Sequence, residues 1–185
     1  MSLWKKKKAK ACIQARSRKR DSDGNIIIDM TVSNDDDFLS VYSTSHTPVI
    51  STDVAAFIEN SGHSISVRES IALHIHSNCI DDGEKMEYAS AMKEYYAEKY
   101  MASRKELRLN RIIALLLLIA GVLVLTFAFY IEHHIWSEVI DIAAWVLLWE
   151  AVVIWAFKNR ELVLLSKRYL AFMNMKVEYL HMEKK

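Results

Sequence analysis

An uncharged stretch of twenty residues, Ile112 to Ile131, constrains the fold of this chain more than any other feature. Its sequence is IIALLLLIAGVLVLTFAFYI, and it is bounded by Arg111 and Glu132. At a rise of about 1.5 Å per residue, such a helix is roughly 30 Å long, which matches the hydrocarbon core of a bilayer. The stretch therefore predicts a first transmembrane helix over residues 112–131.

A second apolar stretch, Val139 to Phe157, follows after a short polar segment. It predicts a second transmembrane helix, with residues 132–138 as an extracytoplasmic turn between the two spans. Asp141 lies near its outer end and Glu150 lies close to its middle. Because an acid at the centre of a span opposes insertion by about 2.5 to 3.5 kcal/mol, we expect this helix to insert with help from the first one.

Basic residues flank both spans on one side, whereas residues 132–138 contain no Lys or Arg. They are Arg104, Lys105, Arg108 and Arg111 before the first span, and Lys158, Arg160, Lys167 and Arg168 after the second. Positive residues stay in the cytoplasm. The pattern therefore predicts a helical hairpin in the plasma (cytoplasmic) membrane, with both termini cytoplasmic.

The region before the first span divides by charge. Residues 1–22 predict a basic disordered tail, since residues 1–20 hold nine Lys/Arg and no acid. Anionic lipid head groups can bind the tail through Lys5, Lys6, Lys7 and Lys8, and they can bind the basic residues from Arg104 to Arg111 in the same way. Each cation near such a surface contributes on the order of 1 kcal/mol of binding free energy. The alternative is a soluble arm without a specific contact. Residues 21–100 hold fifteen acids against four Lys/Arg, so we expect no nucleic-acid partner.

Residues 23–80 predict a small cytosolic α+β domain. Apolar and polar residues alternate from Ile26 to Val32 and from Ile71 to His76, which is typical of half-buried strands. Between them, Ser51 or Thr52 can cap a short helix that ends at Gly62.

Residues 81–111 predict a cytosolic helix leading into the membrane. Asp81 and Glu84 have the spacing of a capping box, and no helix breaker follows before Gly121. We therefore expect one long helix from Asp82 to Ile131. Its residues at helical spacing are Met86, Ala89, Met92 or Lys93, and Tyr96, and we expect Tyr88, Tyr95 and Tyr100 to add aromatic packing surface.

Residues 158–185 predict a cytosolic C-terminal helix. Leu162, Leu165, Tyr169 and Phe172 keep a three-four spacing, and Met173, Val177 and Leu180 form an adjacent apolar line. We expect this helix to pack as a coiled coil against the 86–100 helix or against its copy in an oligomer. The predicted fold class is membrane α-helical: a two-span hairpin with long cytosolic helical extensions and the small α+β domain.

Ionisable groups inside a span are candidate functional sites. The intramembrane acids are Glu150 and Asp141, and the outer polar cluster is Glu132, His133, His134 and Glu138. Matching depths across the hairpin puts Glu150 opposite residues 119–121, which offer no side-chain donor. Its expected partner is water, a proton or another subunit. Glu150 then either lines a conducting path or, when protonated, joins helices by hydrogen bonding.

Signatures of catalysis and of cofactor binding are absent from the sequence. It has no nucleophile elbow, phosphate-binding glycine loop or zinc-protease motif, and it contains four glycines. His74 and His76 share one face of the second predicted strand, but a zinc site needs a third ligand that the sequence does not indicate. We therefore expect no enzyme, no cofactor and no firm metal site.

These features predict a two-pass integral membrane protein that is not an enzyme. Its small cytosolic domain would serve in partner binding, assembly or regulation. The alternative is an oligomeric cation channel or transport component that uses Glu150 or the outer cluster of His134, Glu138 and Asp141. Expected partners are the bilayer, anionic lipid head groups, and copies of this chain or another membrane protein.

Overall fold

The structure is a computed structural model that describes residues 19–34, 37–44, 48–128, 130 and 134–181, with the backbone alone at 134–136. The chain divides into two compact units. Met1–Glu98 and Arg168–Lys185 form one, which we call the α/β unit, and Lys99–Lys167 form the other, which we call the hairpin unit. Most of the predicted basic tail lies outside the described residues.

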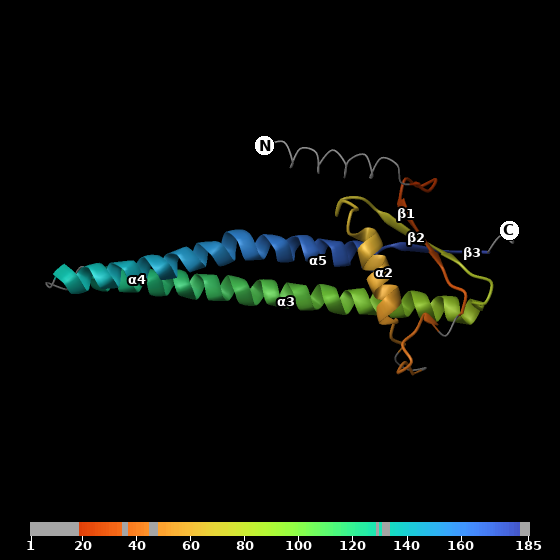
Figure 1. Ribbon diagram of the computed structural model, residues 1–185, viewed down its shortest axis with the longest axis horizontal. Coiled ribbons are helices and arrows are strands. Elements are labelled where there is room, and N and C mark those ends of the chain that lie inside the picture. Colours follow the sequence, from red (N-terminus) through yellow and green to blue (C-terminus); the bar gives the residue numbers. More distant parts are fainter. Residues whose placement is uncertain (1–18, 35–36, 45–47, 129, 131–133, 182–185) are drawn as a thin grey trace. The chain divides into compact units, whose positions relative to one another are not determined.

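The α/β unit contains a sheet of three parallel strands (Figure 1). The central strand β2 (Ile71–His76) pairs with β1 (Ile26–Thr31) on one side and with β3 (Lys176–Leu180) on the other. Because parallel neighbours need a crossover connection, the unit has α/β rather than α+β organisation. The expected strands at Ile26 and Ile71 are present, and their pairing direction is the new information.

Helix α2 (Thr52–Gly62) makes the first crossover, between β1 and β2. As expected, Ser51 caps it: the Ser51 hydroxyl accepts a hydrogen bond from the backbone N–H of Asp53 at 3.4 Å. A side-chain cap satisfies one of the amides that a helix start leaves without a partner. This crossover lets β1 and β2 lie side by side although 39 residues separate them in the sequence.

The second crossover, between β2 and β3, contains the entire hairpin unit. It consists of α3 (Asp82–Ala128), α4 (His134–Val153), the π-helical turn η2 (Ile154–Lys158) and α5 (Asn159–Met173). The expected C-terminal helix over 158–185 is therefore wrong beyond Met173, because the chain then forms β3. Val177 and Tyr179 face the core there, while Lys176 and Glu178 point the other way, which is the alternation of a strand.

Large side chains fill the core of the α/β unit on one face of the sheet. Phe38 stacks on Tyr88 with ring centroids 4.4 Å apart, and Tyr96 lies 5.1 Å from Phe172. The expected packing of the C-terminal helix against the first half of α3 is thus present within one chain. Of the residues expected to pack on α3, Tyr88, Met92 and Tyr96 are buried, whereas Met86 is 74% exposed.

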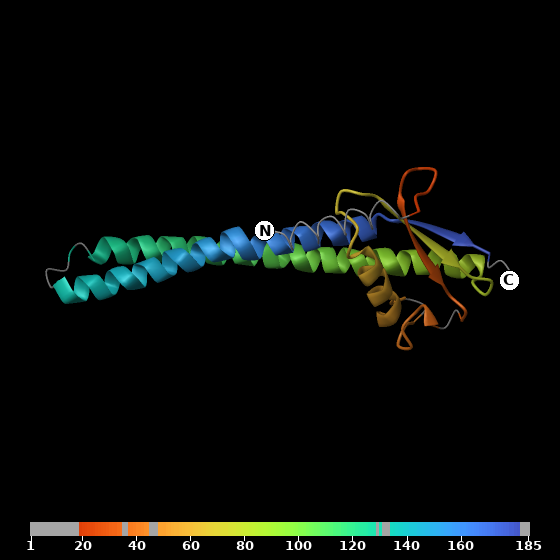
Figure 2. The same ribbon diagram turned by 45° about the horizontal axis from the view of Figure 1, so that its top comes forward.

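Among the described residues, two helices are long and apolar enough to cross a membrane, namely Asp82–Ala128 and Ser137–Met173, and the hairpin unit contains most of both. Figure 2 shows α4 returning alongside the later half of α3. Only 17% of the most apolar window of each helix is buried. A helix in the core of a soluble protein is mostly buried, so these two helices direct most of their apolar surface outward.

Small side chains occupy the seam between the two arms of the hairpin unit. The buried residues of the seam are Ser103, Leu107, Ala114, Gly121 and Ala128 on α3, and Ala144, Ala151, Ile154, Asn159 and Ser166 on the returning arm. A Cβ atom on Gly121 would lie 2.8 Å from Cγ of Leu148, so this glycine permits the close approach. Small residues between helices are typical of packing inside membranes, where close backbone contact replaces the hydrophobic effect.

The π turn η2 keeps this seam continuous. Buried positions on the returning arm are three or seven residues apart, which is close to whole turns of an α-helix, except between Ile154 and Asn159, where the step is five. A π turn holds one residue more than an α turn. The extra residue is absorbed there, and Asn159 and Ser166 return to the face that carries Ala144 and Ala151.

Candidate functional site

Cations collect at one level of the hairpin unit. Gly121 contacts Leu148, and ten residues from this contact on each arm lie Arg111 and Lys158. The two arms are antiparallel, so these two cations mark the same level. We call the cations near this level the basic belt: Arg104, Lys105, Arg108, Arg111, Lys158, Arg160 and Lys167.

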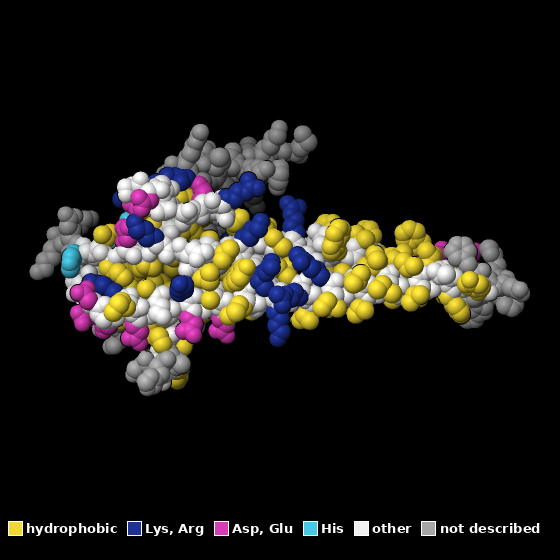
Figure 3. Space-filling model, turned by 180° about the vertical axis from the view of Figure 1, so that it is seen from behind, with side chains coloured by type: hydrophobic (Ala, Val, Ile, Leu, Met, Phe, Trp, Pro, Cys, Tyr) yellow, Lys and Arg dark blue, Asp and Glu magenta, His cyan; other side chains and the backbone are white. Residues whose placement is uncertain are grey.

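The basic belt lies where the outward apolar surface begins. Figure 3 shows the dark blue side chains gathered there, followed by a stretch in which yellow side chains stand out from the white backbone. The predicted site residues Arg104, Lys105, Arg108 and Arg111 are all exposed. The other predicted cations, Lys5 to Lys8, lie outside the described residues. The belt therefore consists of residues that the positive-inside pattern singles out on both arms.

Glu150 lies inside the apolar stretch and pairs with Lys158. The Lys158 ammonium donates a hydrogen bond to Oε1 of Glu150 at 3.2 Å. The expectation that Glu150 needs water, a proton or another subunit as its partner is therefore wrong. Eight residues of α-helix would leave the two side chains roughly 80° apart, and the extra residue of η2 brings them to within about 20° of one line.

The pair is on the outer surface of the hairpin unit. The Glu150 side chain is 47% exposed and the Lys158 side chain is 55% exposed. Neither points into the small-residue seam. An acid inside a helix that could span a membrane, paired with a cation from the basic belt, is a functional-site candidate, and π turns often occur at functional sites.

The predicted outer cluster is only partly described. Glu132 and His133 lie outside the described residues, and at His134 the backbone alone is described, as the first residue of α4. Glu138 and Asp141 follow on α4, where Asp141 is half-buried. The acids therefore lie at the opposite end of the apolar stretch from the basic belt, while their proposed grouping with His134 stays a prediction.

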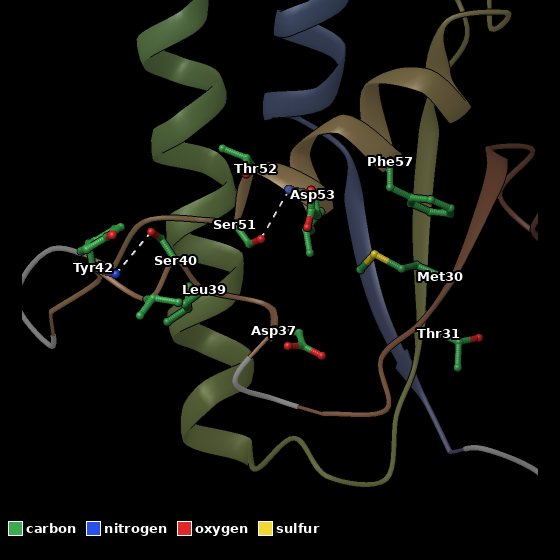
Figure 4. Close-up of a pocket in the computed structure, with 12 residues that line it drawn as sticks. Met30, Thr31, Asp37, Leu39, Ser40, Tyr42, Ser51, Thr52, Asp53 and Phe57 are labelled. Carbon is green, nitrogen blue, oxygen red and sulfur yellow. Dashed lines mark hydrogen bonds between the residues drawn. The ribbon is translucent and has the colours of Figure 1, made fainter.

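A hollow of about 750 Å³ opens in the α/β unit between the end of β1 and the start of α2. Figure 4 shows it with Met30 and Phe57 on one side and the carboxylates of Asp37 and Asp53 approaching from two others. In open α/β sheets, ligands bind at the carboxyl ends of the strands. The hollow occupies this position beside β1, and no residue pattern in the sequence indicates it.

The chemistry of this hollow favours a positively charged group. Asp37 and Asp53 supply two carboxylates, and the hydroxyls of Ser40, Ser51 and Thr52 add further acceptors. The first turn of a helix attracts anions by itself, but the carboxylate of Asp53 already occupies that turn. Exposed apolar groups lie beside the carboxylates: Val41 is 94% exposed and Tyr42 is 92% exposed.

A second polar group lies on the face of the sheet away from the core. Strand register places Asp29, His74 and Glu178 in one row across β1, β2 and β3. His74 lies 3.2 Å from Glu178, and Oδ1 of Asp29 lies 3.3 Å from His76. Among the described residues, no three His, Cys, Asp or Glu side chains are arranged to hold a metal ion.

Lys176 connects this row to the loop before β1. Its ammonium lies 2.9 Å from Glu178 and 2.9 Å from Asp23. These hydrogen bonds and charges raise the pKa of Lys176 above its usual value, Glu178 being the larger cause. The row is therefore a network of polar side chains on the outer face of the sheet, and the ion pairs of Lys176 with Glu178 and Asp23 tie β3 to the loop before β1.

Comparison with known proteins identifies no relative: no protein-family model, curated protein or solved structure matches this chain.

Proposed function

We propose that this chain is a two-pass integral membrane protein whose α/β unit lies in the cytoplasm and binds a protein partner, in the service of assembly or regulation. The observation that carries this proposal is the outward apolar surface of the hairpin unit. Two helices satisfy the length of a span, yet only 17% of each apolar window is buried. Monomeric soluble proteins rarely expose contiguous apolar patches larger than a few hundred Å².

Charge gives the proposed orientation. The chain enters and leaves the hairpin unit near Lys99 and Lys167, at the end that carries the basic belt. Cations of this kind stay on the cytoplasmic side of a bilayer. The turn over residues 132–138 is then the only part outside, and both flanking segments of the α/β unit are cytoplasmic.

Membrane topology is the first test of this proposal. In a chain with Cys12 and Cys79 replaced by serine, single cysteines at Ser22 and at His133 report which side is accessible. A membrane-impermeant maleimide added to intact cells should label the His133 position alone, and the Ser22 position only after permeabilisation. A chain that stays in solution after cell lysis without detergent would overturn the proposal.

Partner binding is proposed for the hollow beside β1. Two carboxylates next to exposed Val41 and Tyr42 suit a protein segment that presents a cationic side chain beside an apolar one. A photoreactive amino acid at Tyr42 should give a discrete crosslinked product in native membranes. Asp53→Asn should weaken that product severalfold, whereas Asp82→Asn, which changes an exposed carboxylate outside the hollow, should leave it unchanged.

Ion conduction is the second candidate function, and Glu150 is the observation that favours it. It is a half-exposed acid on the outer surface of an apolar hairpin, where a second subunit would place it in a shared path. Under this proposal, Glu150→Gln changes cation flux in reconstituted liposomes while the protein still inserts. Liposomes in which the unaltered protein supports no flux would exclude this candidate.

A further inference from the structure

We propose that the hairpin unit binds one anionic phospholipid of the cytoplasmic leaflet, with its phosphate at Arg111 and an acyl chain in the groove beside it. This inference rests on the proposed membrane insertion and adds a specific ligand to it. The groove has a volume of about 440 Å³ and lies between α3 and the returning arm. Its lining is Arg111, Ala114, Leu115, Leu118, Ala151, Val152 and Trp155.

The shape of the groove follows from the small residues of the seam. Ala114 and Ala151 are buried and form its floor, because neither has a side chain long enough to fill the space between the arms. Leu118 and Val152 form walls, each 46% exposed. A hydrocarbon chain gains contacts on several sides there, which a smooth helix surface does not offer.

The charge of the groove selects an amphiphile. Arg111 is the one charged side chain in its lining, and it lies at the level of the basic belt, while every other lining residue is apolar. A ligand that satisfies both parts has an anionic group at one end and hydrocarbon behind it. A guanidinium binds phosphate oxygens through paired hydrogen bonds, which makes it well suited to a phospholipid head group.

A second copy of this chain fits the groove less well. Copies in one membrane share the same orientation, so they meet level with level. At the level of Arg111 each copy would present Arg108, Lys158 and Arg160, which repel Arg111. Glu150 lies eight residues deeper than Lys158 on the same arm and already pairs with it. A second copy therefore supplies no anionic group to Arg111, whereas an anionic lipid does.

The test is lipid retention by the full chain after reconstitution with equal amounts of phosphatidylglycerol and phosphatidylcholine. Native mass spectrometry of the detergent-released protein should show bound phosphatidylglycerol in preference to phosphatidylcholine, because both lipids carry a phosphate but Arg111 repels the choline cation of phosphatidylcholine. Arg111→Gln should reduce this preference about fivefold, because it removes the direct contact of the guanidinium with the head group in the groove, and a loss of about 1 kcal/mol is a fivefold change in affinity. The control Arg104→Gln removes a belt cation seven residues earlier, outside the groove, and should retain the preference.

A second pair of variants tests the acyl chain. Leu118→Trp fills the groove and should reduce retention of both lipids, whereas Leu116→Trp, at a 60% exposed position outside the lining, should not. Equal preference in the unaltered chain and in Arg111→Gln would overturn the inference. So would a dimer that Leu118→Trp dissociates, because the occupant would then be a second copy.

Failure of this inference is separable from failure of the proposed function. The same variants are fractionated by carbonate extraction of membranes. Protein that stays in the membrane fraction but shows no lipid preference overturns the phospholipid site alone. Protein that is released into solution overturns both proposals.

Discussion

The two units of this chain sort their side chains by size in opposite ways. In the α/β unit the largest buried residues are aromatic, such as Tyr96, Phe38 and Phe172, and charged groups cover the outside. In the hairpin unit the seam holds Ala114, Gly121 and Ala144, while Trp149 and Phe127 are more than 60% exposed. The α/β unit buries its large apolar side chains, whereas the hairpin unit exposes them on helices that are long and apolar enough to cross a membrane. This difference predicts which mutations have large effects in each unit.

The largest expected effect concerns the continuity of the seam. Deleting Val146, an exposed residue of α4, rotates one part of the arm by about 100° against the other and removes either Ala144 or Ala151 from the seam. Deleting Ala156, an exposed residue of the π turn, instead converts η2 to a regular α turn. We expect the protein without Val146 to be neither monodisperse nor resistant to protease in detergent.

The second deletion should be tolerated. Without Ala156, the step from Ile154 to Asn159 becomes the four residues of an α-helix, so the seam stays in line. Thermal unfolding in detergent compares both deletions with the unaltered chain. Equal disruption by the two deletions would show that η2 is needed for a reason other than seam continuity.

The next prediction compares the same substitution at a buried phenylalanine of the α/β unit and at an exposed phenylalanine of the hairpin unit. Phe172→Ala removes an aromatic ring from the α/β core and should cost about 3 to 5 kcal/mol of stability. Phe127→Ala removes the same atoms from an outward position of the hairpin unit, and it should change stability by less than about 1 kcal/mol in detergent. Chemical denaturation followed by circular dichroism measures both. A large loss for Phe127→Ala would contradict the size inversion between the units.

The local elements of both units follow from the sequence. The alternation around Ile28, the Ser51 cap and the two apolar stretches each depend on residues close in the chain, and all are present. Residues 81–84 gave a further local signal: the backbone N–H of Asp81 donates to the carboxylate of Glu84 at 2.8 Å, which is half of the expected capping box.

Strand β3 was not predicted because its residues fit two patterns. Val177 and Leu180 continue the three-four spacing of the preceding helix, and Val177 and Tyr179 also alternate with Lys176 and Glu178. The alternation became decisive only through pairing with β2, about one hundred residues earlier. The row of Asp29, His74 and Glu178 was unpredictable for the same reason, because strand register is a long-range property.

The Glu150 and Lys158 pair was missed for a different reason. A regular helix places these side chains on different lines, and the π turn that aligns them leaves no clear mark in the residue pattern. The small-residue seam did leave one: Ala114, Gly121 and Ala128 recur every seven residues on α3. That repeat, together with the outward large residues, could have predicted which face of the first span meets the second.

A smaller effect tests the close approach inside the hairpin unit. Gly121→Leu places a side chain where even a Cβ atom lies 2.8 Å from Leu148, and overpacking of this kind costs about 1 to 3 kcal/mol. Val122→Leu adds a methylene at the next position, which is 49% exposed, and should be neutral. Thermal unfolding in detergent gives the difference. Equal stability of the two variants would mean that the seam has room to adjust.

The smallest effects concern tyrosine hydroxyl groups in the core of the α/β unit, where a buried polar atom needs a hydrogen-bond partner. The Tyr179 hydroxyl donates to the carbonyl of Lys85 at 3.0 Å, whereas the buried Tyr96 hydroxyl has no partner among the described residues. A net hydrogen bond contributes about 1 kcal/mol, and an unsatisfied buried group costs a similar amount. We expect Tyr179→Phe to lower the free energy of unfolding by about 1 kcal/mol and Tyr96→Phe to raise it by about as much.

The pH dependence of unfolding reports on these two tyrosines, which belong to the α/β unit and not to the hairpin unit. Burial raises the pKa of Tyr179 to about 12, and burial is also the main cause that raises the pKa of Tyr96, with the charge of Glu59 adding to it. Between pH 10 and the raised values, the unfolded chain loses these protons while the folded unit keeps them, so stability is full below about pH 10 and falls as the pH rises. Tyr96→Phe removes one titrating group and should flatten this alkaline decline in denaturation curves measured from pH 9 to 12. If the decline keeps its slope in Tyr96→Phe and in Tyr179→Phe alike, it arises from groups outside the aromatic core, and the contrast between the two units would then not extend to their titration.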